Sequence, residues 1–103
     1  MNRQTKIVCE EYLQWVRSQS CCVCGRTPVD PDHLKARGRG EAKRNDFTAI
    51  PLCREHHSER GQLGDEKFQE ECKINLWEEV AYRLMRFWIY RVNHGVNIEF
   101  GKI

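Results

Sequence analysis

Residues 21–60 read CCVCGRTPVDPDHLKARGRGEAKRNDFTAIPLCREHHSER and contain two pairs of residues at metal-ligand spacing. Cys21 and Cys24 form a CxxC pair, and Cys53 and His56 form a second pair with the same gap. Two ligands separated by two residues can hold a metal from a tight turn, and two such pairs complete a tetrahedron. Gly25 suits the positive-φ position of the first turn. The spacing predicts one structural zinc site.

A CxxC pair alone also suits a thiol redox centre. No βαβ pattern surrounds Cys21 and Cys24, and a second half-site follows, so the pattern favours zinc over redox chemistry. Cys22 lies too close to Cys24 to replace Cys21 as a ligand. Cys9 and Cys72 lie on predicted helical faces and are interpreted as small buried hydrophobic residues.

The composition predicts one soluble domain over residues 1–103, because 40% of the residues are hydrophobic and 31% are charged. No run is long and apolar enough for a membrane span, so no membrane partner is expected. The N-terminus lacks the apolar segment of a secretory signal, which predicts a cytoplasmic protein. The net charge of +2 does not by itself indicate nucleic-acid binding.

Two helices are predicted to flank the zinc-containing core at residues 20–61. Apolar residues recur with a helical period near the N-terminus and again in the C-terminal third, which assigns helices to residues 5–18 and 65–92. Thr5 and Asp65 are the predicted N-terminal caps of these helices. The chain therefore predicts a single core with helices on both sides.

The three tryptophans are predicted to pack together across these two helices. Trp15 lies in the first helix, and Trp77 and Trp88 lie in the second. Large aromatic rings are most simply interpreted as core residues. We expect them to cover one face of the zinc module.

Inside the core, two short strands are predicted at residues 32–34 and 47–52, joined by a basic, glycine-containing loop. A short helix is predicted from residue 53 to 60, ended by Gly61 and Gly64. The loop of about 12 residues has no structure of its own, and loops of this length are usually functional or disordered.

Three residues near the zinc ligands suggest hydrolytic chemistry. Asp32 and His33 begin the first strand, and His57 directly follows His56. A carboxylate and an imidazole can hold a divalent cation while a neighbouring imidazole takes a proton from water. Hydrolysis of a phosphodiester needs both parts.

Residues 21–60 resemble the HNH endonucleases of the zinc-knuckle type, which have the ββα-metal or His-Me finger fold. They look most like small phage and prophage members of the Ref and YbcO kind. The resemblance implies an α+β fold in which Asp32 and His57 bind the catalytic metal and His33 is the general base. With so few protein ligands, that metal is expected to be Mg²⁺ or Mn²⁺. The resemblance also implies a protein encoded by a bacterium or a phage.

The middle Asn of the family pattern has no direct counterpart. Thr48 occupies its position, whereas Asn45 and Asp46 lie a few residues earlier. In the family this residue holds the loop between the strands through backbone hydrogen bonds. Each of the three has a short side chain that can bond to nearby backbone, so each can fill the role.

The loop after His33 predicts contact with an anionic backbone, because it carries five cations and small glycines that let the main chain approach phosphates. Nothing resembles a base-reading helix, so little sequence specificity is expected. A basic loop is compatible with double-stranded, single-stranded or branched DNA and with RNA, so the substrate and the oligomeric state are left open. The five cations are Lys35, Arg37, Arg39, Lys43 and Arg44.

The leading hypothesis is a metal-dependent DNA endonuclease that acts in phage or prophage recombination or DNA processing. The alternative is a non-catalytic nucleic-acid-binding module that keeps the zinc frame. The two hypotheses differ in whether replacing His33 abolishes cleavage or whether cleavage is absent from the start.

Overall fold

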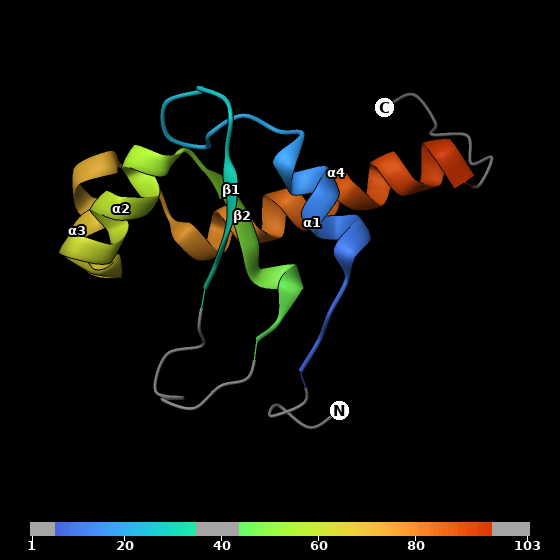
Figure 1. The fold of residues 1–103 in the computed structure, drawn as a ribbon, viewed down its shortest axis with the longest axis horizontal. Coiled ribbons are helices and arrows are strands. Elements are labelled where there is room, and N and C mark those ends of the chain that lie inside the picture. Colours follow the sequence, from blue (N-terminus) through green and yellow to red (C-terminus); the bar gives the residue numbers. More distant parts are fainter. Residues whose placement is uncertain (1–5, 35–43, 96–103) are drawn as a thin grey trace.

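The computed structural model describes residues 6–34 and 44–95 and shows an α+β protein. Within these residues, four helices surround a small two-stranded sheet, with the longest helix running behind the strands and two short helices at one end (Figure 1). The elements are α1 (Glu10–Arg17), β1 (Asp30–His33), the 3-10 turn η1 (Asp46–Thr48), β2 (Ala49–Leu52), α2 (Arg54–Leu63), α3 (Asp65–Cys72) and α4 (Leu76–Gly95).

The sheet is an antiparallel pair in which Asp32 lies opposite Ile50 and His33 lies opposite Ala49. Every residue of β2 is buried, and α2 begins two residues after β2 ends. The predicted second strand was therefore too long, because its first two residues belong to η1. The Thr48 N–H bonds to the Asn45 carbonyl, which curls the chain before it can pair.

Two apolar clusters lie on either side of this sheet. The larger one joins β2 to α3 and the first turns of α4, and the smaller one joins α1 to Ala49. The Tyr12 hydroxyl donates to the Ala49 carbonyl at 3.2 Å, and burial raises its pKa to about 12. The buried members of the larger cluster are Cys21, Val29, Leu34, Ile50, Leu52, Cys53, Phe68, Leu76 and Val80.

The first helix begins later than the sequence predicted. Residues 6–9 lie outside α1, and Ile7 forms an isolated parallel bridge with Asn45. The Ile7 N–H donates to the Arg44 carbonyl, and the Ile7 carbonyl accepts from the Asp46 N–H. A backbone that pairs with a distant segment cannot also make helical bonds, so tertiary contacts override the local period. The predicted cap, Thr5, lies outside the described residues.

The C-terminal helix predicted over residues 65–92 is two helices. Lys73 has a φ of 56°, which ends α3, and α4 starts at Leu76. The Asn75 side chain accepts from the Glu78 N–H, which caps α4. The break lets Phe68 and Leu76 enter the same core cluster, and the spacing of apolar residues did not reveal it.

The end of α2 also differs from the prediction. The helix continues through Gly61 and ends at Gly64, whose φ is 83°. Gly64 is also the N-cap of α3, so Asp65 is the first residue of that helix and not its cap. A left-handed backbone at this point separates the two helices, and glycine adopts it without steric cost.

The three tryptophans do not pack together. Trp15 stacks against Tyr12 and contacts Phe87, whereas Trp77 and Trp88 are exposed. The prediction of a shared tryptophan core was wrong, because α4 packs Leu84 and Phe87 against the α1 cluster and leaves Trp77 and Trp88 exposed. Among the described helices, none combines the length and apolar character that crossing a bilayer requires.

Candidate metal and catalytic site

Four side chains converge between the first turn, the end of β2 and the start of α2. Cys21 and Cys24 come from the turn that precedes β1, while Cys53 and His56 come from the N-cap and first turn of α2. The four ligand atoms all lie within 4.8 Å of one another. The structure therefore forms the cluster that the spacing predicted, and this cluster can hold a metal ion.

The distances inside the cluster match a tetrahedral zinc site. Cys24 Sγ lies 3.8 Å from Cys53 Sγ, and His56 Nδ1 lies 3.7 Å from Cys21 Sγ and 3.3 Å from Cys53 Sγ. Ligands bound to zinc at about 2.3 Å for sulfur and 2.0 Å for nitrogen are about 3.5–3.8 Å apart in a tetrahedron. The donor set is consistent with structural zinc.

The two neighbouring cysteines differ in their acidity. Burial opposes ionisation of Cys21, yet backbone hydrogen bonds at Cys53 and Cys24 lower the pKa of its thiol to about 6. Burial raises the pKa of the adjacent Cys22 thiol to about 12. Metals bind the thiolate, so the local environment favours Cys21 as the ligand.

A second cluster of polar side chains joins α2 to β1. His57 Nδ1 of α2 lies 3.3 Å from Oδ2 of Asp32, the third residue of β1, so the strand and the helix come together here as the sequence predicted. Arg60, one helical turn after His57, donates from Nη1 to Asp32 Oδ1 at 2.8 Å and from Nε to Asp65 Oδ1 at 2.8 Å. Burial opposes the charge of Arg60, but its hydrogen bonds to Asp65 and Asp32 raise its pKa, so it stays a cation.

One oxygen of this cluster lacks a donor. Asp32 is 5% exposed, and its Oδ2 receives no hydrogen bond among the described residues. The 3.3 Å approach of His57 does not have the geometry of a hydrogen bond. An unpaired buried carboxylate oxygen costs about 1–3 kcal/mol or more, and a bound cation would remove that cost. Asp32 Oδ2 and His57 Nδ1 are the two atoms at which the sequence predicts the catalytic cation.

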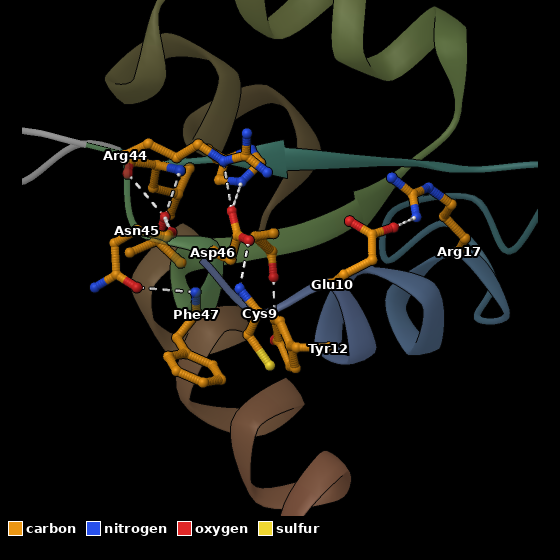
Figure 2. A network of polar contacts seen from close by, with 12 residues as sticks. Cys9, Glu10, Tyr12, Arg17, Arg44, Asn45, Asp46 and Phe47 are labelled. Atoms are coloured by element: carbon orange, nitrogen blue, oxygen red, sulfur yellow. Dashed lines mark hydrogen bonds and ion pairs between the residues drawn. The ribbon is translucent and has the colours of Figure 1, made fainter. Parts of the chain in front are cut away.

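His33 reaches a different carboxylate. Its Nε2 lies 2.9 Å from Oδ1 of Asp46, which is completely buried in η1. The same carboxylate accepts from Arg44 Nε at 2.6 Å and from the Cys9 N–H at 2.7 Å, as Figure 2 shows. Three donors from three segments therefore meet at Asp46.

The charge of Asp46 determines which nitrogen of His33 carries a proton. Burial opposes ionisation of Asp46, but the bonds from Arg44, Cys9 and His33 lower its pKa to about 2. At neutral pH it is a carboxylate, which only accepts hydrogen bonds, so the facing Nε2 of His33 must be the protonated nitrogen. In the neutral imidazole, Nδ1 then has the lone pair that can accept a proton.

Thr48 ties the two ends of the loop together. Its Oγ1 donates toward the Leu34 carbonyl and the Asn45 carbonyl, and it accepts from the Leu34 N–H at 3.2 Å. The Asn45 side chain accepts from the Phe47 N–H, which caps η1. Of the three residues considered for the middle position, Thr48 thus makes the backbone contacts across the loop, and Asp46 contacts His33.

The predicted basic loop is only partly within the described residues. Arg44 is described, and its half-exposed side chain is directed to Asp46. The remaining cations of the loop lie outside the described residues, namely Lys35, Arg37, Arg39 and Lys43.

The sequence reasoning did not assign roles to Arg60 or to the pairing of Asp46 with His33. Arg60 follows His57 by three residues, which places both on one helical face, so this signal was present. No sequence pattern indicated the contact between Asp46 and His33, because this contact depends on how η1 is placed relative to β1.

Fold and site together define a small α+β protein with a four-ligand Cys/His cluster that can hold a metal ion. Residues 2–83 match the family described as "Protein of unknown function (DUF968)", and because this match covers most of the chain, the chain belongs to that family. A stretch of 59 residues, 55% of the chain, is 41% identical to the protein named "Uncharacterized protein YdfU" of Escherichia coli (strain K12). The match covers 17% of that relative, so the chain spans a small part of its length. No solved structure matches the chain significantly.

Proposed function

We propose that the chain is a metal-dependent endonuclease that hydrolyses DNA phosphodiester bonds with little sequence preference. On this proposal the hairpin of β1 and β2 and the following α2 form an HNH-type ββα-metal module held by structural zinc, similar to the small phage and prophage members of that superfamily. The observation that carries the proposal is the unpaired, buried Oδ2 of Asp32, which faces His57 next to the strand position of His33.

Each residue has a distinct role in the proposed reaction. His33 takes a proton from water at Nδ1, because Nε2 is committed to Asp46. Asp46 is a positioning residue that fixes the ring and its tautomer, much as a carboxylate orients the histidine in hydrolytic triads. Thr48 holds the ends of the loop that follows His33.

Asp32, through Oδ2, and His57, through Nδ1, are the residues that would hold the catalytic cation, Mg²⁺ or Mn²⁺. Such a cation supplies positive charge against the charge that develops on the phosphate and the leaving oxygen. Arg60 neutralises the other oxygen of Asp32 and opposes a second cation, so metal affinity without substrate is expected to be weak. Magnesium sites of this kind gain further ligands from substrate phosphates.

The ion pair of Arg60 with Asp32 favours one alternative function. The pair already compensates the charge of Asp32, so the cluster also suits a structural role in a zinc-stabilised nucleic-acid-binding module without catalysis. The two functions share the zinc frame and differ in whether His33 and Asp32 act on a substrate.

The test is incubation of the zinc-loaded protein with supercoiled plasmid in Mg²⁺, Mn²⁺ or chelator, with His33→Ala beside it. The proposal predicts metal-dependent conversion to open-circular DNA that falls by about 10²–10⁴-fold in the variant, the usual contribution of a general base. His94→Ala is the matched control, because it removes a histidine to which the proposal gives no role, and it should cleave like the parent.

Two outcomes would contradict the proposal. Equal cleavage by His33→Ala would indicate a contaminant or another base. Absence of cleavage on plasmid, single-stranded and branched DNA, by folded protein that still binds DNA, would support the binding module instead.

A further inference from the structure

The segment ahead of α1 makes three hydrogen bonds to the residues that lead into η1. The Ile7 N–H donates to the Arg44 carbonyl at 2.9 Å, and the Ile7 carbonyl accepts from the Asp46 N–H at 3.0 Å. The Cys9 N–H donates to Oδ2 of Asp46 at 2.7 Å (Figure 2). We call residues 7–9 the N-terminal strap. The strap contacts Asp46 at both its backbone and its side chain, and it does so with main-chain atoms.

The two oxygens of the Asp46 carboxylate have different partners among the described residues. Oδ2 accepts from the Cys9 N–H, whereas Oδ1 accepts from His33 Nε2 at 2.9 Å and from Arg44 Nε at 2.6 Å. The torsion that turns an aspartate carboxylate has a broad preference, so hydrogen bonds set its angle. Because the carboxylate is planar, the donor that holds Oδ2 also sets the direction in which Oδ1 faces His33.

Arg44 is the weaker restraint on this carboxylate. Its side chain is half-exposed, and it donates to the same oxygen as His33. A partly exposed ion pair contributes little, because ordering a long side chain costs entropy and water competes for both charges. The Cys9 amide has no side-chain rotamer to order, and it reaches a carboxylate that is completely buried. The strap is therefore the firmer of the two restraints.

The strap lies at the edge of the apolar core. Cys9 packs against the smaller apolar cluster, but Val8 is 59% exposed and Ile7 forms an isolated bridge with Asn45. None of the four residues of the Cys/His cluster belongs to the strap. Loss of one strap bond is therefore expected to displace Asp46 while the Cys/His cluster and the larger apolar cluster stay in place.

We propose that the N-terminal strap is a positioning element of the candidate site: its main-chain bonds fix the Asp46 carboxylate, which in turn orients the His33 ring. The effect on cleavage rests on the proposed function, whereas the state of the ring is measured without DNA. Since the strap acts through main-chain atoms, changes of its side chains should be tolerated, and changes that remove an N–H should not.

The first test compares two variants at Cys9. Cys9→Pro removes the N–H that donates to Asp46, and Cys9→Ala keeps it. In ¹⁵N spectra, Cys9→Ala should keep the parent form of His33 with its proton on Nε2, and Cys9→Pro should show a mixture of tautomers. On DNA, kcat of Cys9→Pro should fall about 10–100-fold at an unchanged KM, the usual cost of displacing an orienting group. Zinc content and circular dichroism report whether each variant is folded.

The second test moves the proline along the strap. Ile7→Pro removes the N–H that donates to the Arg44 carbonyl and leaves the Cys9 N–H in place, so its effect on the tautomer should have the same direction but be smaller. Val8→Pro is the matched control, because the Val8 N–H makes none of the three strap bonds. Proline there also favours an extended backbone at the preceding residue, which suits the bridge of Ile7.

Two outcomes would overturn the role of the strap. They are a folded Cys9→Pro protein in which His33 keeps the parent tautomer, and a Val8→Pro protein that changes the tautomer as much as Cys9→Pro does. If Cys9→Pro does not fold, an unchanged tautomer in Ile7→Pro overturns it instead. A changed tautomer in protein whose parent never cleaves DNA would support the strap and contradict the proposed function, so the two can fail separately.

Discussion

The two polar clusters that include residues of α2 differ in how their charges are balanced. In the Cys/His cluster, four ligand atoms lie within 4.8 Å of one another and offer lone pairs to a common centre; they belong to Cys21, Cys24, Cys53 and His56. Around Asp32, and separately around Asp46 and His33, most groups already have partners within the chain. A cation thus completes the first cluster, whereas the second is organised by protein groups.

This difference shows what each cluster contributes. When a metal ion binds a site whose ligands contact only one another, the binding free energy adds to the free energy of folding, because the metal is the partner that the ligands lack. A site whose residues are held by an arginine and by Asp46 keeps its shape without metal, apart from one oxygen of Asp32. Loss of metal is therefore expected to affect the first cluster most, whereas the second keeps its protein partners.

The largest effect is expected when the Cys/His cluster loses a ligand. Cys53→Ser should unfold the protein, because structural zinc contributes about 10–16 kcal/mol in small domains, as much as the whole stability of a typical one. Circular dichroism melting and zinc content measure this. Cys72→Ser is the matched control, a partly buried cysteine outside the cluster, and should melt within a few degrees of the parent. An unchanged melting temperature for Cys53→Ser would refute the metal cluster.

An intermediate effect is expected at Asp46. Asp46→Asn should keep its zinc and its fold but lose about 2–3 kcal/mol of stability, because the buried carboxylate accepts three bonds and the amide cannot replace all of them. The ¹⁵N shifts of His33 should also change from the Nε2-protonated form to a mixture. A single unaltered tautomer in this variant would show that Asp46 does not position the ring.

The pH dependence of stability in the same variant tests whether Asp46 is charged in the folded protein. Asp46 has a folded pKa of about 2, below the unfolded value of about 3.9. Its stabilisation is therefore present above the unfolded pKa and is lost as the pH falls toward 2. The advantage of the parent over Asp46→Asn in urea unfolding should shrink below about pH 5, and a constant difference would contradict the lowered pKa.

The smallest effect is expected at Thr48. Thr48→Val keeps the volume but removes the hydroxyl that bridges Leu34 and Asn45, which should cost about 1 kcal/mol in unfolding free energy. Thr27→Val, at an exposed site, is the control and should be nearly neutral. If the two variants are equally stable, the hydroxyl does not hold the loop.

The sequence predicted the parts of the molecule that depend on short spacings. The CxxC and CxxH pairs identified the four-ligand cluster, and the Asp-His pair with His57 identified the approach of Asp32 to α2. These predictions succeed because a ligand pair on a turn or helix is fixed by the local backbone.

The features that the sequence did not predict depend on distant partners. The helix break at Lys73 allows Phe68 and Leu76 to pack in the same core cluster. Helical periodicity in the sequence cannot detect such a break. Residues 6–9 have a helical pattern but pair with Arg44 and Asp46 instead. The HNH resemblance itself stays a prediction, and cleavage is the measurement that tests it.

The contact between the Cys9 N–H and Asp46 also bears on how far the motif can be transplanted. Residues 21–60 carry all the recognisable pattern, yet the carboxylate that holds His33 takes one of its three donors from ahead of α1. Tyr12 likewise bonds to Ala49 from outside that stretch. A graft of the motif alone into another scaffold would carry the ligands but leave Asp46 short of a donor. The stretch that carries the recognisable motif is thus shorter than the stretch needed to rebuild the site.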